Sequence, residues 1–189
     1  YINILTSLKL GIDNQDIEAI KTVYNGVLRD SGNQFYDSKF DIAKLSNIKN
    51  DAIKSILSAK LLEAQNRGIS ISVEIEEPVS NFRIELLDFI TILSVLCDNA
   101  IEATIEAISP RMTVAFMNND DSLVLIIENS IKSEKVDVNH IFAKGYSSKG
   151  EGRGLGLHNV NSVLEKYPKS TITTRSANHL FSQTIRFCK

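Results

Sequence analysis

The chain has 189 residues, enough to bury a sizeable core in one ordinary domain with a modest second element. Its 43% apolar and 23% charged residues are typical of a globular protein, and its net charge of −2 gives no electrostatic reason to expect a nucleic acid partner. The two cysteines, Cys97 and Cys188, form neither a disulfide framework nor a CxxC metal site, which fits a reducing compartment.

Residues 1–40 carry apolar side chains at helical spacing in two short runs. The first run contains Leu5, Leu8 and Ile12, and a second begins at Ile17 after a break at residues 13–14. We therefore predict a short αα-hairpin. Such a hairpin cannot bury its apolar stripe alone, so we expect it to dimerise with a second copy of the chain. Because the helical pattern already includes the first residue, we expect the chain to be a fragment of a longer protein.

Residues 41–189 mix helical and strand patterns. Residues 37–50 indicate a connector, residues 52–64 a helix that ends at Gly68, and "ISISVEIEE" a strand with one solvent-facing side. A long helix is predicted over 82–108, followed by the hairpin "RMTVAFMNNDDSLVLIIENS", a helix reaching Tyr167, and the strand pair "STITTRSA" and "LFSQTIRF". This order predicts an α+β sandwich with helices on one face of a mixed sheet.

The stretch "SSKGEGRGLGLHNV", residues 147–160, places Gly152, Gly154 and Gly156 at alternate positions before a helix. Backbone N–H groups of such a loop can converge on a phosphate at the helix N-terminus, with Lys149 and Arg153 adding positive charge. From the loop alone, a flexible turn before a helix explains the glycines equally well. No strand runs directly into the loop as a dinucleotide-binding motif requires, and no Walker A pattern is present.

Two asparagines stand in apolar surroundings. Asn99 interrupts an apolar helical stripe, where its amide oxygen can serve as a ligand of Mg²⁺ or bond neighbouring backbone. Asn129 ends the apolar face of the strand "LVLIIEN", where it can accept a hydrogen bond from the amine of a base or start a turn. The histidines lack metal-ligand spacing and are interpreted as surface or structural residues; they are His140, His158 and His179.

Read in order, "LCDNAIEA", "IIENS" and "FAKGYSSKGEGRGLGLHNV" resemble the N, G1, F and G2 boxes of the ATP-binding domain of sensor histidine kinases in the GHKL superfamily. The stretches "DNAIEA", "SAKLLEAQNRGISISVEI" and "GEGRGLGL" look most like the peptide-pheromone quorum-sensing receptor kinases of the accessory-gene-regulator and competence type, over essentially the whole chain. Members of that group carry the phosphoacceptor in a His-Asp-Tyr-x-Asn pattern. Residues 1–3 resemble the tail of this pattern, which places the acceptor histidine two positions before Tyr1.

The resemblance implies a Bergerat-type ATP-binding α/β sandwich over residues 41–189, preceded by a partial dimerisation and phosphotransfer hairpin over residues 1–40. Asn99 would be the catalytic residue that holds Mg²⁺ between the phosphates, Asn129 would read the adenine amine, and residues 131–151 would form a lid. The other nucleotide contacts that it implies are Lys149, Gly152, Arg153, Gly154, Leu155 and Gly156. The role of Glu102 stays open.

The implied activity is transfer of the ATP γ-phosphate to the upstream histidine and then to a response regulator. The resemblance also implies a homodimer through the hairpin, a peptide pheromone sensed by a membrane domain outside this sequence, and a cytoplasmic position in a cell-membrane protein.

Two positions depart from the wider family. Asn129 stands where most histidine kinases use an adenine-reading aspartate, a neutral replacement typical of the pheromone-receptor subgroup. Val95 replaces a polar residue one helical turn before Asn99. Val95 leaves no carboxylate to activate water, which disfavours the first alternative, a GHKL ATPase that hydrolyses ATP to drive a conformational cycle. The second alternative is a non-catalytic dimerising module, which Asn129 keeps open and Asn99 with the three glycines disfavours.

Overall fold

The computed structural model describes residues 9–10, 12–22, 44–138 and 156–188. The chain divides into two units, residues 1–39 and 40–189, which are described separately. None of the helices in the described ranges is long and apolar enough to cross a membrane.

The described residues of the first unit form two helical pieces, residues 9–13 without 11 and residues 17–22, joined by a turn at Gln15, whose φ is 54°. The second piece is capped by Asp16, whose Oδ1 accepts a hydrogen bond of 2.9 Å from the Ala19 backbone N–H. The cap is therefore Asp16, and the break between the two helical pieces lies at residues 14–16, slightly later than the predicted residues 13–14. The rest of the predicted hairpin lies outside the described residues.

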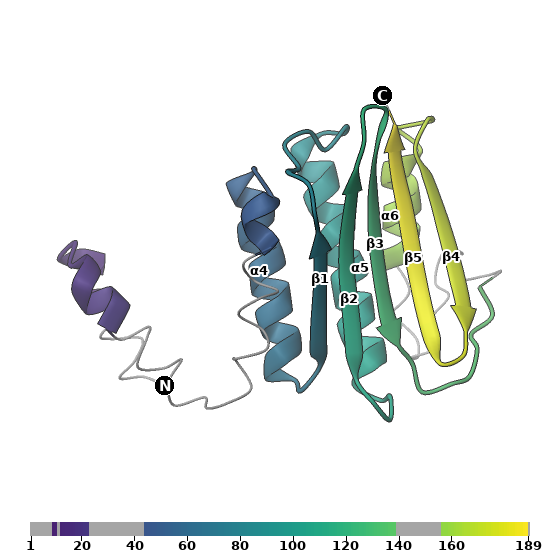
Figure 1. Ribbon diagram of the computed structural model, residues 1–189, viewed down its shortest axis with the longest axis horizontal. Coiled ribbons are helices and arrows are strands. Elements are labelled where there is room, and N and C mark those ends of the chain that lie inside the picture. Colours follow the sequence, from purple (N-terminus) through teal and green to yellow (C-terminus); the bar gives the residue numbers. More distant parts are fainter. Residues whose placement is uncertain (1–8, 11, 23–43, 139–155, 189) are drawn as a thin grey trace. The chain divides into compact units, whose positions relative to one another are not determined.

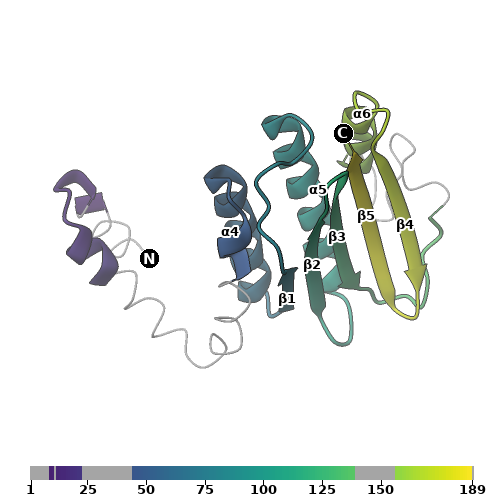
Figure 2. The same cartoon turned by 45° about the horizontal axis from the view of Figure 1, so that its top comes forward.

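The second unit is built on a five-stranded mixed sheet in the order β1-β2-β3-β5-β4. Its strands are β1 (Ser70–Ile75), β2 (Arg111–Asn118), β3 (Ser122–Ser130), β4 (Thr171–Ala177) and β5 (Leu180–Cys188). Strand β1 pairs in parallel with β2, and the other neighbours are antiparallel. The helices α4 (Asp51–Asn66), α5 (Leu86–Thr104) and α6 (Gly156–Leu164) cover one face of the sheet (Figures 1 and 2). The predicted layered arrangement of helices on a mixed sheet is confirmed.

The ends of α4 follow from local chemistry. Asn50 precedes the helix and its Oδ1 accepts from the Ile53 backbone N–H at 3.1 Å, which satisfies one of the free donors of the first turn. Gly68 has φ 77°, a conformation that glycine adopts without steric cost, and lies just beyond the helix. The helix stop predicted at this glycine is confirmed.

Two expectations from the sequence need correction. Helix α5 begins at Leu86 and ends at Thr104, several residues inside the predicted range 82–108. Arg83 has φ 67°, which no right-handed helix accommodates, and Thr104 turns its hydroxyl to the backbone oxygens of Ala100 and Ser130. The predicted connector is also more than a linker, because a 3-10 helix, η1 (Leu45–Asn47), and the following Ile48 place Leu45 and Ile48 in the core.

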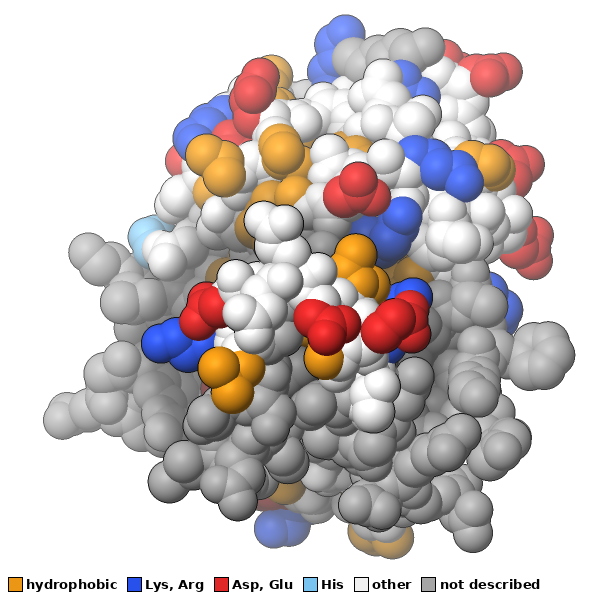
Figure 3. Space-filling view, turned by 90° about the vertical axis from the view of Figure 1, so that its left-hand side faces the viewer, with side chains coloured by type: hydrophobic (Ala, Val, Ile, Leu, Met, Phe, Trp, Pro, Cys, Tyr) orange, Lys and Arg blue, Asp and Glu red, His pale blue; other side chains and the backbone are white. Residues whose placement is uncertain are grey.

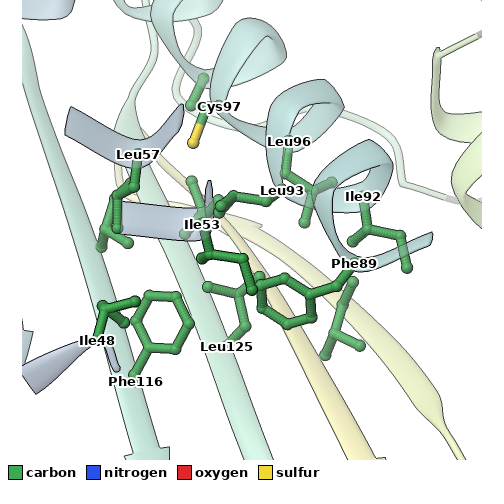
Figure 4. Close-up of a cluster of buried hydrophobic side chains, with 14 of the residues drawn as sticks. Ile48, Ile53, Leu57, Phe89, Ile92, Leu93, Leu96, Cys97, Phe116 and Leu125 are labelled. Atoms are coloured by element: carbon green, nitrogen blue, oxygen red, sulfur yellow. The ribbon is translucent and has the colours of Figure 1, made fainter. Parts of the chain in front are cut away.

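The core lies between the helices and the sheet. Figure 4 shows Ile53 and Leu57 of α4 and Phe89, Leu93 and Leu96 of α5 among side chains that include Phe116 and Leu125 of the sheet. Phe89 is fully buried, and its ring lies 4.7, 6.3 and 5.3 Å from the rings of Phe82, Phe116 and Phe187, respectively. These aromatic contacts fix the first half of α5 on the sheet.

The β4–β5 hairpin holds the start of the predicted lid. Its two central residues, Asn178 and His179, have φ 52° and 60°, as a type I′ turn requires. The His179 backbone N–H donates to Glu134 and its carbonyl accepts from Ile131, at 3.0 and 2.9 Å. The Val136 backbone N–H donates to Ser176 Oγ at 2.9 Å. Residues 131–136 are therefore anchored to this hairpin, and His179 has the structural role expected from the sequence.

A polar cluster joins the start of α5 to the residues that follow α6. Tyr167 Oη donates to Asp88 Oδ2 at 2.6 Å and accepts from the Glu85 backbone N–H at 3.2 Å, while Lys166 Nζ lies 3.0 Å from Asp88 Oδ1. The hydrogen bond from Tyr167, together with that from Lys166, lowers the pKa of the Asp88 carboxyl. Asp88 therefore couples the positions of the two helices.

We expect this cluster to make stability depend on pH. Because the folded-state pKa of Asp88 is below its unfolded value, its contribution is present above the unfolded pKa and disappears as the pH falls through the folded one. Asp88→Asn should lower the Tm at pH 7, and the difference from the parent should shrink as the pH falls below about 4. Thermal denaturation across pH 2–8 measures this. Asp120→Asn, in the β2–β3 turn, is the control, and a deficit that persists at low pH would contradict the role of Asp88 ionisation.

Candidate functional site

Helix α5 presents its motif residues to two different neighbours. Lys60 Nζ on α4 donates to Asp98 Oδ1 at 2.5 Å, and this hydrogen bond raises the pKa of Lys60. The next residue, Asn99, is rotated by about 100° around the helix and contacts the first residue of α6. Asp98 therefore fixes α5 against α4, while Asn99 faces the gap between α5 and α6.

The last glycine of the predicted phosphate loop lies directly against this face of α5. A Cβ atom on Gly156 would stand 3.1 Å from Val95 Cγ1 and 3.8 Å from both amide atoms of Asn99. The absence of a side chain thus lets the start of α6 approach Asn99. The structure brings together two residues that the sequence analysis selected separately.

One atom of the Asn99 amide, its donor nitrogen, is not satisfied by the described residues. This Nδ2 atom is buried and has no hydrogen-bond partner among them. A buried orphan donor costs about 1–3 kcal/mol, so a polar partner from outside the chain would recover that cost. An amide side chain at a helix N-terminus matches what Mg²⁺ with phosphates needs, since Mg²⁺ takes few protein oxygens when phosphates complete its shell.

Asn129 lies at the end of β3 on the side of the sheet that faces the helices. It alternates with Leu123, Leu125 and Ile127, which belong to the core, and is 2% exposed. Its Nδ2 donates to the Ser130 backbone oxygen at 2.9 Å. Because that carbonyl can only accept, the amide orientation is fixed and Oδ1 is left as an acceptor.

The other predicted nucleotide contacts, Lys149, Gly152, Arg153, Gly154 and Leu155, lie outside the described residues, as does the lid beyond residue 138. Glu102 makes an interaction within the chain.

Gln183 of β5 was not among the predicted site residues, although it interrupts an apolar face formed by Phe181, Ile185 and Phe187. It is 2% exposed and its Nε2 has no hydrogen-bond partner within the described part of the chain. The pattern that singled out Asn129, a polar residue on an apolar strand face, is the signal that would have found it.

Other features near the site do not add reactive groups. Burial raises the pKa of the Cys97 thiol to about 12, so this residue stays protonated and packs as a small apolar side chain. A hollow of about 500 Å³, lined by residues that include Glu128, Arg175 and Thr184, lies on the opposite face of the sheet from Asn129. Across the described ranges, no three His, Cys, Asp or Glu side chains gather in a way that could hold a metal ion.

Comparison with known proteins identifies the family. Residues 84–188, more than half of the 189-residue chain, match the family described as "GHKL domain". This chain belongs to the GHKL family. Its sheet and helices form the Bergerat ATP-binding fold of histidine kinase catalytic domains, so the predicted fold class is confirmed.

Relatives of the GHKL domain are sensor proteins. The sensor protein CitS of Bacillus subtilis (strain 168) is 30% identical over 170 residues, which are 86% of this chain and 29% of that protein. The sensor histidine kinase DcuS of Escherichia coli (strain K12) is 30% identical over 144 residues, 74% of this chain and 26% of that protein. The chain thus spans less than a third of the length of these relatives.

Two solved structures share the fold of the GHKL domain. The catalytic domain of histidine kinase ThkA has a TM-score of 0.63 at 18% identity and covers 75% of this chain and 92% of its own. Acinetobacter baumannii histidine kinase AdeS has a TM-score of 0.55 at 20% identity and covers 99% of this chain and 94% of its own. The GHKL domain is therefore an ATP-binding domain of the sensor histidine kinase type.

Gly156 provides a test of the packing in the GHKL domain. We expect Gly156→Ala to displace the start of α6 from Asn99, because its Cβ would stand 3.1 Å from Val95 Cγ1. ATP affinity should fall about tenfold and recover in the double variant Val95→Ala/Gly156→Ala, in which that methyl group is gone. Calorimetric titration with Mg²⁺-ATP measures both. A double variant as weak as Gly156→Ala would show that the contact with Val95 is not the cause.

Proposed function

We propose that this chain is the ATP-binding catalytic core of a two-component sensor histidine kinase. It binds ATP, transfers the γ-phosphate to a histidine upstream of Tyr1, and supplies phosphate in that way to an aspartate of a response regulator. The observation that carries the proposal is the Asn99 Nδ2 atom, which is buried without a partner among the described residues, beside Gly156 at the start of α6 within a GHKL domain. Phosphoryl transfer needs positioning and charge neutralisation more than a reactive side chain, and this site offers those.

Each residue of the site has a role in the proposal. The Asn99 amide oxygen is a ligand of Mg²⁺, which when bound neutralises charge on the phosphates, and Asn99 Nδ2 gains a partner at the same time. Asn129 Oδ1 accepts a hydrogen bond from the adenine amine. Backbone N–H groups of Gly152, Gly154, Leu155 and Gly156 hold the phosphates, and Lys149 and Arg153 add positive charge. Residues 131–151 would form the lid over the bound nucleotide, with residues 131–136 as its anchored base.

The proposal includes two parts and a narrower subtype. Residues 1–40 are a partial dimerisation and phosphotransfer hairpin, and residues 41–189 the catalytic domain. Exposed apolar side chains on the hairpin, Leu10, Ile12 and Ile17, support pairing with a second copy. On the face of the molecule that Figure 3 presents, hydrophobic side chains lie interspersed with charged ones. Sedimentation tests the dimer by comparing the oligomeric state of the chain with that of the variant Ile12→Lys/Ile17→Lys, which should be monomeric.

The subtype is a peptide-pheromone receptor of the quorum-sensing type, with this chain as its cytoplasmic portion and a membrane sensor domain before it. The motifs "DNAIEA" and "GEGRGLGL" and the asparagine at position 129 support it. We expect the phosphorylation rate of the full-length protein in membranes to change when a peptide secreted by the cells that make this protein is added. A response to a small carboxylate in place of a peptide would contradict the subtype and leave the kinase proposal intact.

The kinase proposal is tested by incubating the chain, extended by its native upstream residues, with Mg²⁺ and γ-labelled ATP. We expect label on the protein that is lost in acid, survives base and is absent from Asn99→Ala. Free phosphate without labelled protein would support the hydrolytic ATPase, and neither product would support a non-catalytic module.

A further inference from the structure

The helix-facing side of the sheet carries a row of polar side chains across three strands. Gln183 of β5 lies directly opposite Ile127 of β3 and Thr174 of β4, so it points to the same side as Asn129. Gln183 Nε2 and Thr174 Oγ1 are both buried without a hydrogen-bond partner within the described part of the chain. Since buried polar groups are rarely left unsatisfied, this row is suited to receive a polar partner that the described residues do not supply, and a bound nucleotide can supply it.

Gln183 lies at the level of the proposed nucleotide site. Helix α5 and strand β3 run in the same direction, because Phe89 contacts Phe187 at one end and Thr104 Oγ1 donates to the Ser130 backbone oxygen at the other. Asn99 precedes Thr104 by a helical rise of roughly 7.5 Å, or about two strand residues. Asn99 therefore lies at the height of residues 127–129 along β3. Gln183 pairs with Ile127 in this same stretch.

Asn129 and Gln183 offer complementary hydrogen-bonding groups. Asn129 pairs with Phe181, two residues from Gln183, so Asn129 and Gln183 are diagonal neighbours roughly 7–8 Å apart. Asn129 Nδ2 is engaged by Ser130, which leaves Oδ1 as an acceptor, while Gln183 Nε2 is an unused donor. An acceptor beside a donor matches the edge of adenine, whose N6 amine donates beside the acceptor N1. Guanine presents the reverse order at this edge, the acceptor O6 beside the donor N1–H.

We propose that Gln183 is a second base-reading residue that, together with Asn129, selects adenine over guanine. Asn129 Oδ1 accepts from the N6 amine, and Gln183 Nε2 donates to the neighbouring ring nitrogen. This inference rests on the proposed function, because it places ATP in the gap beside Asn99. It extends that function to a residue whose effect is on nucleotide specificity and not on phosphate binding.

The test compares Gln183→Met and Gln183→Glu with the parent chain, using calorimetric Kd values for Mg²⁺-ATP and Mg²⁺-GTP and the Tm of each variant without nucleotide. Methionine keeps the length of the side chain and removes the unsatisfied donor, so its Tm should equal or exceed that of the parent. We expect ATP affinity to fall about tenfold with little change for GTP. Glutamate, which offers acceptors only when ionised, should lower the ATP-to-GTP preference further.

Gln65→Met is the matched control, because Gln65 Oε1 is also buried and unpartnered but lies on α4. It should leave both Kd values unchanged. If the parent prefers ATP and Gln183→Met keeps that preference within twofold, Gln183 is only a structural residue and the inference is wrong. If the parent binds neither nucleotide, the proposed function fails together with the inference, and the two failures are distinguished by the parent's own titration.

Discussion

Asn99→Ala should abolish phosphorylation without weakening the fold. We expect the rate of phosphoryl transfer to fall about 100-fold or more, the magnitude seen when one preorganised transition-state contact is removed. The reason is that alanine offers no oxygen to Mg²⁺ at the point where α6 begins beside α5. Transfer is measured with the upstream-extended chain and γ-labelled ATP, and nucleotide binding with the 189-residue chain itself.

The stability of the same variant separates function from structure. Asn99 Nδ2 is buried and unpartnered within the described ranges, so Asn99→Ala removes an unsatisfied donor and breaks no hydrogen bond that Nδ2 makes there, and the Tm should stay equal or rise. Asn118→Ala is the matched control. Asn118 also has a buried, unpartnered amide atom, Oδ1, but its Nδ2 donates to the Pro78 backbone oxygen at 3.2 Å, on β2 and away from the site.

We expect the control to lose stability and to keep phosphorylation, the opposite of Asn99→Ala. A large drop in Tm for Asn99→Ala with an unchanged transfer rate would make Asn99 a structural asparagine, the interpretation that the sequence alone left open.

Much of the fold could be predicted from the sequence because its signals are local. The alternation in β1, the turn residues between β2 and β3, and Gly68 after α4 each act within a few residues. The ends of α5 could not be predicted in that way. They depend on Tyr167 bonding the Glu85 backbone and on Thr104 meeting Ser130, contacts between residues that are distant in sequence.

The candidate site could be predicted in part for the same reason. Asn99 and Asn129 each stand out as polar residues on apolar faces, and the family resemblance assigns each of them to a motif of the ATP-binding domain. The approach of Gly156 to Val95 and Asn99 is a tertiary contact that spacing does not reveal. Gln183 was missed although it interrupts the apolar face of Phe181, Ile185 and Phe187, and its pairing with Ile127 confirms that this face of β5 is the buried one.

Phe89→Ala should have the largest effect on stability. Phe89 is fully buried among the rings of Phe82, Phe116 and Phe187, and replacing such a residue with alanine costs about 3–5 kcal/mol. This loss is a large fraction of the roughly 5–15 kcal/mol that stabilises a domain, and should lower the Tm by about 10 °C or more. Leu87→Ala, two residues away and 77% exposed, is the control and should change the free energy of unfolding by no more than about 0.5 kcal/mol.

The same variant connects the core to the nucleotide site, because α5 carries both Phe89 and Asn99. Mg²⁺-ATP at about 100 times its Kd should restore about 2.7 kcal/mol to Phe89→Ala, since ligand binding stabilises only the folded state. Phe89→Ala/Asn99→Ala should gain much less at the same concentration, because its site binds the nucleotide poorly. Thermal denaturation of both variants with and without Mg²⁺-ATP measures this difference. Equal recovery in the two would mean that the nucleotide binds without Asn99, and the role of Asn99 in holding Mg²⁺ and phosphate would then be wrong.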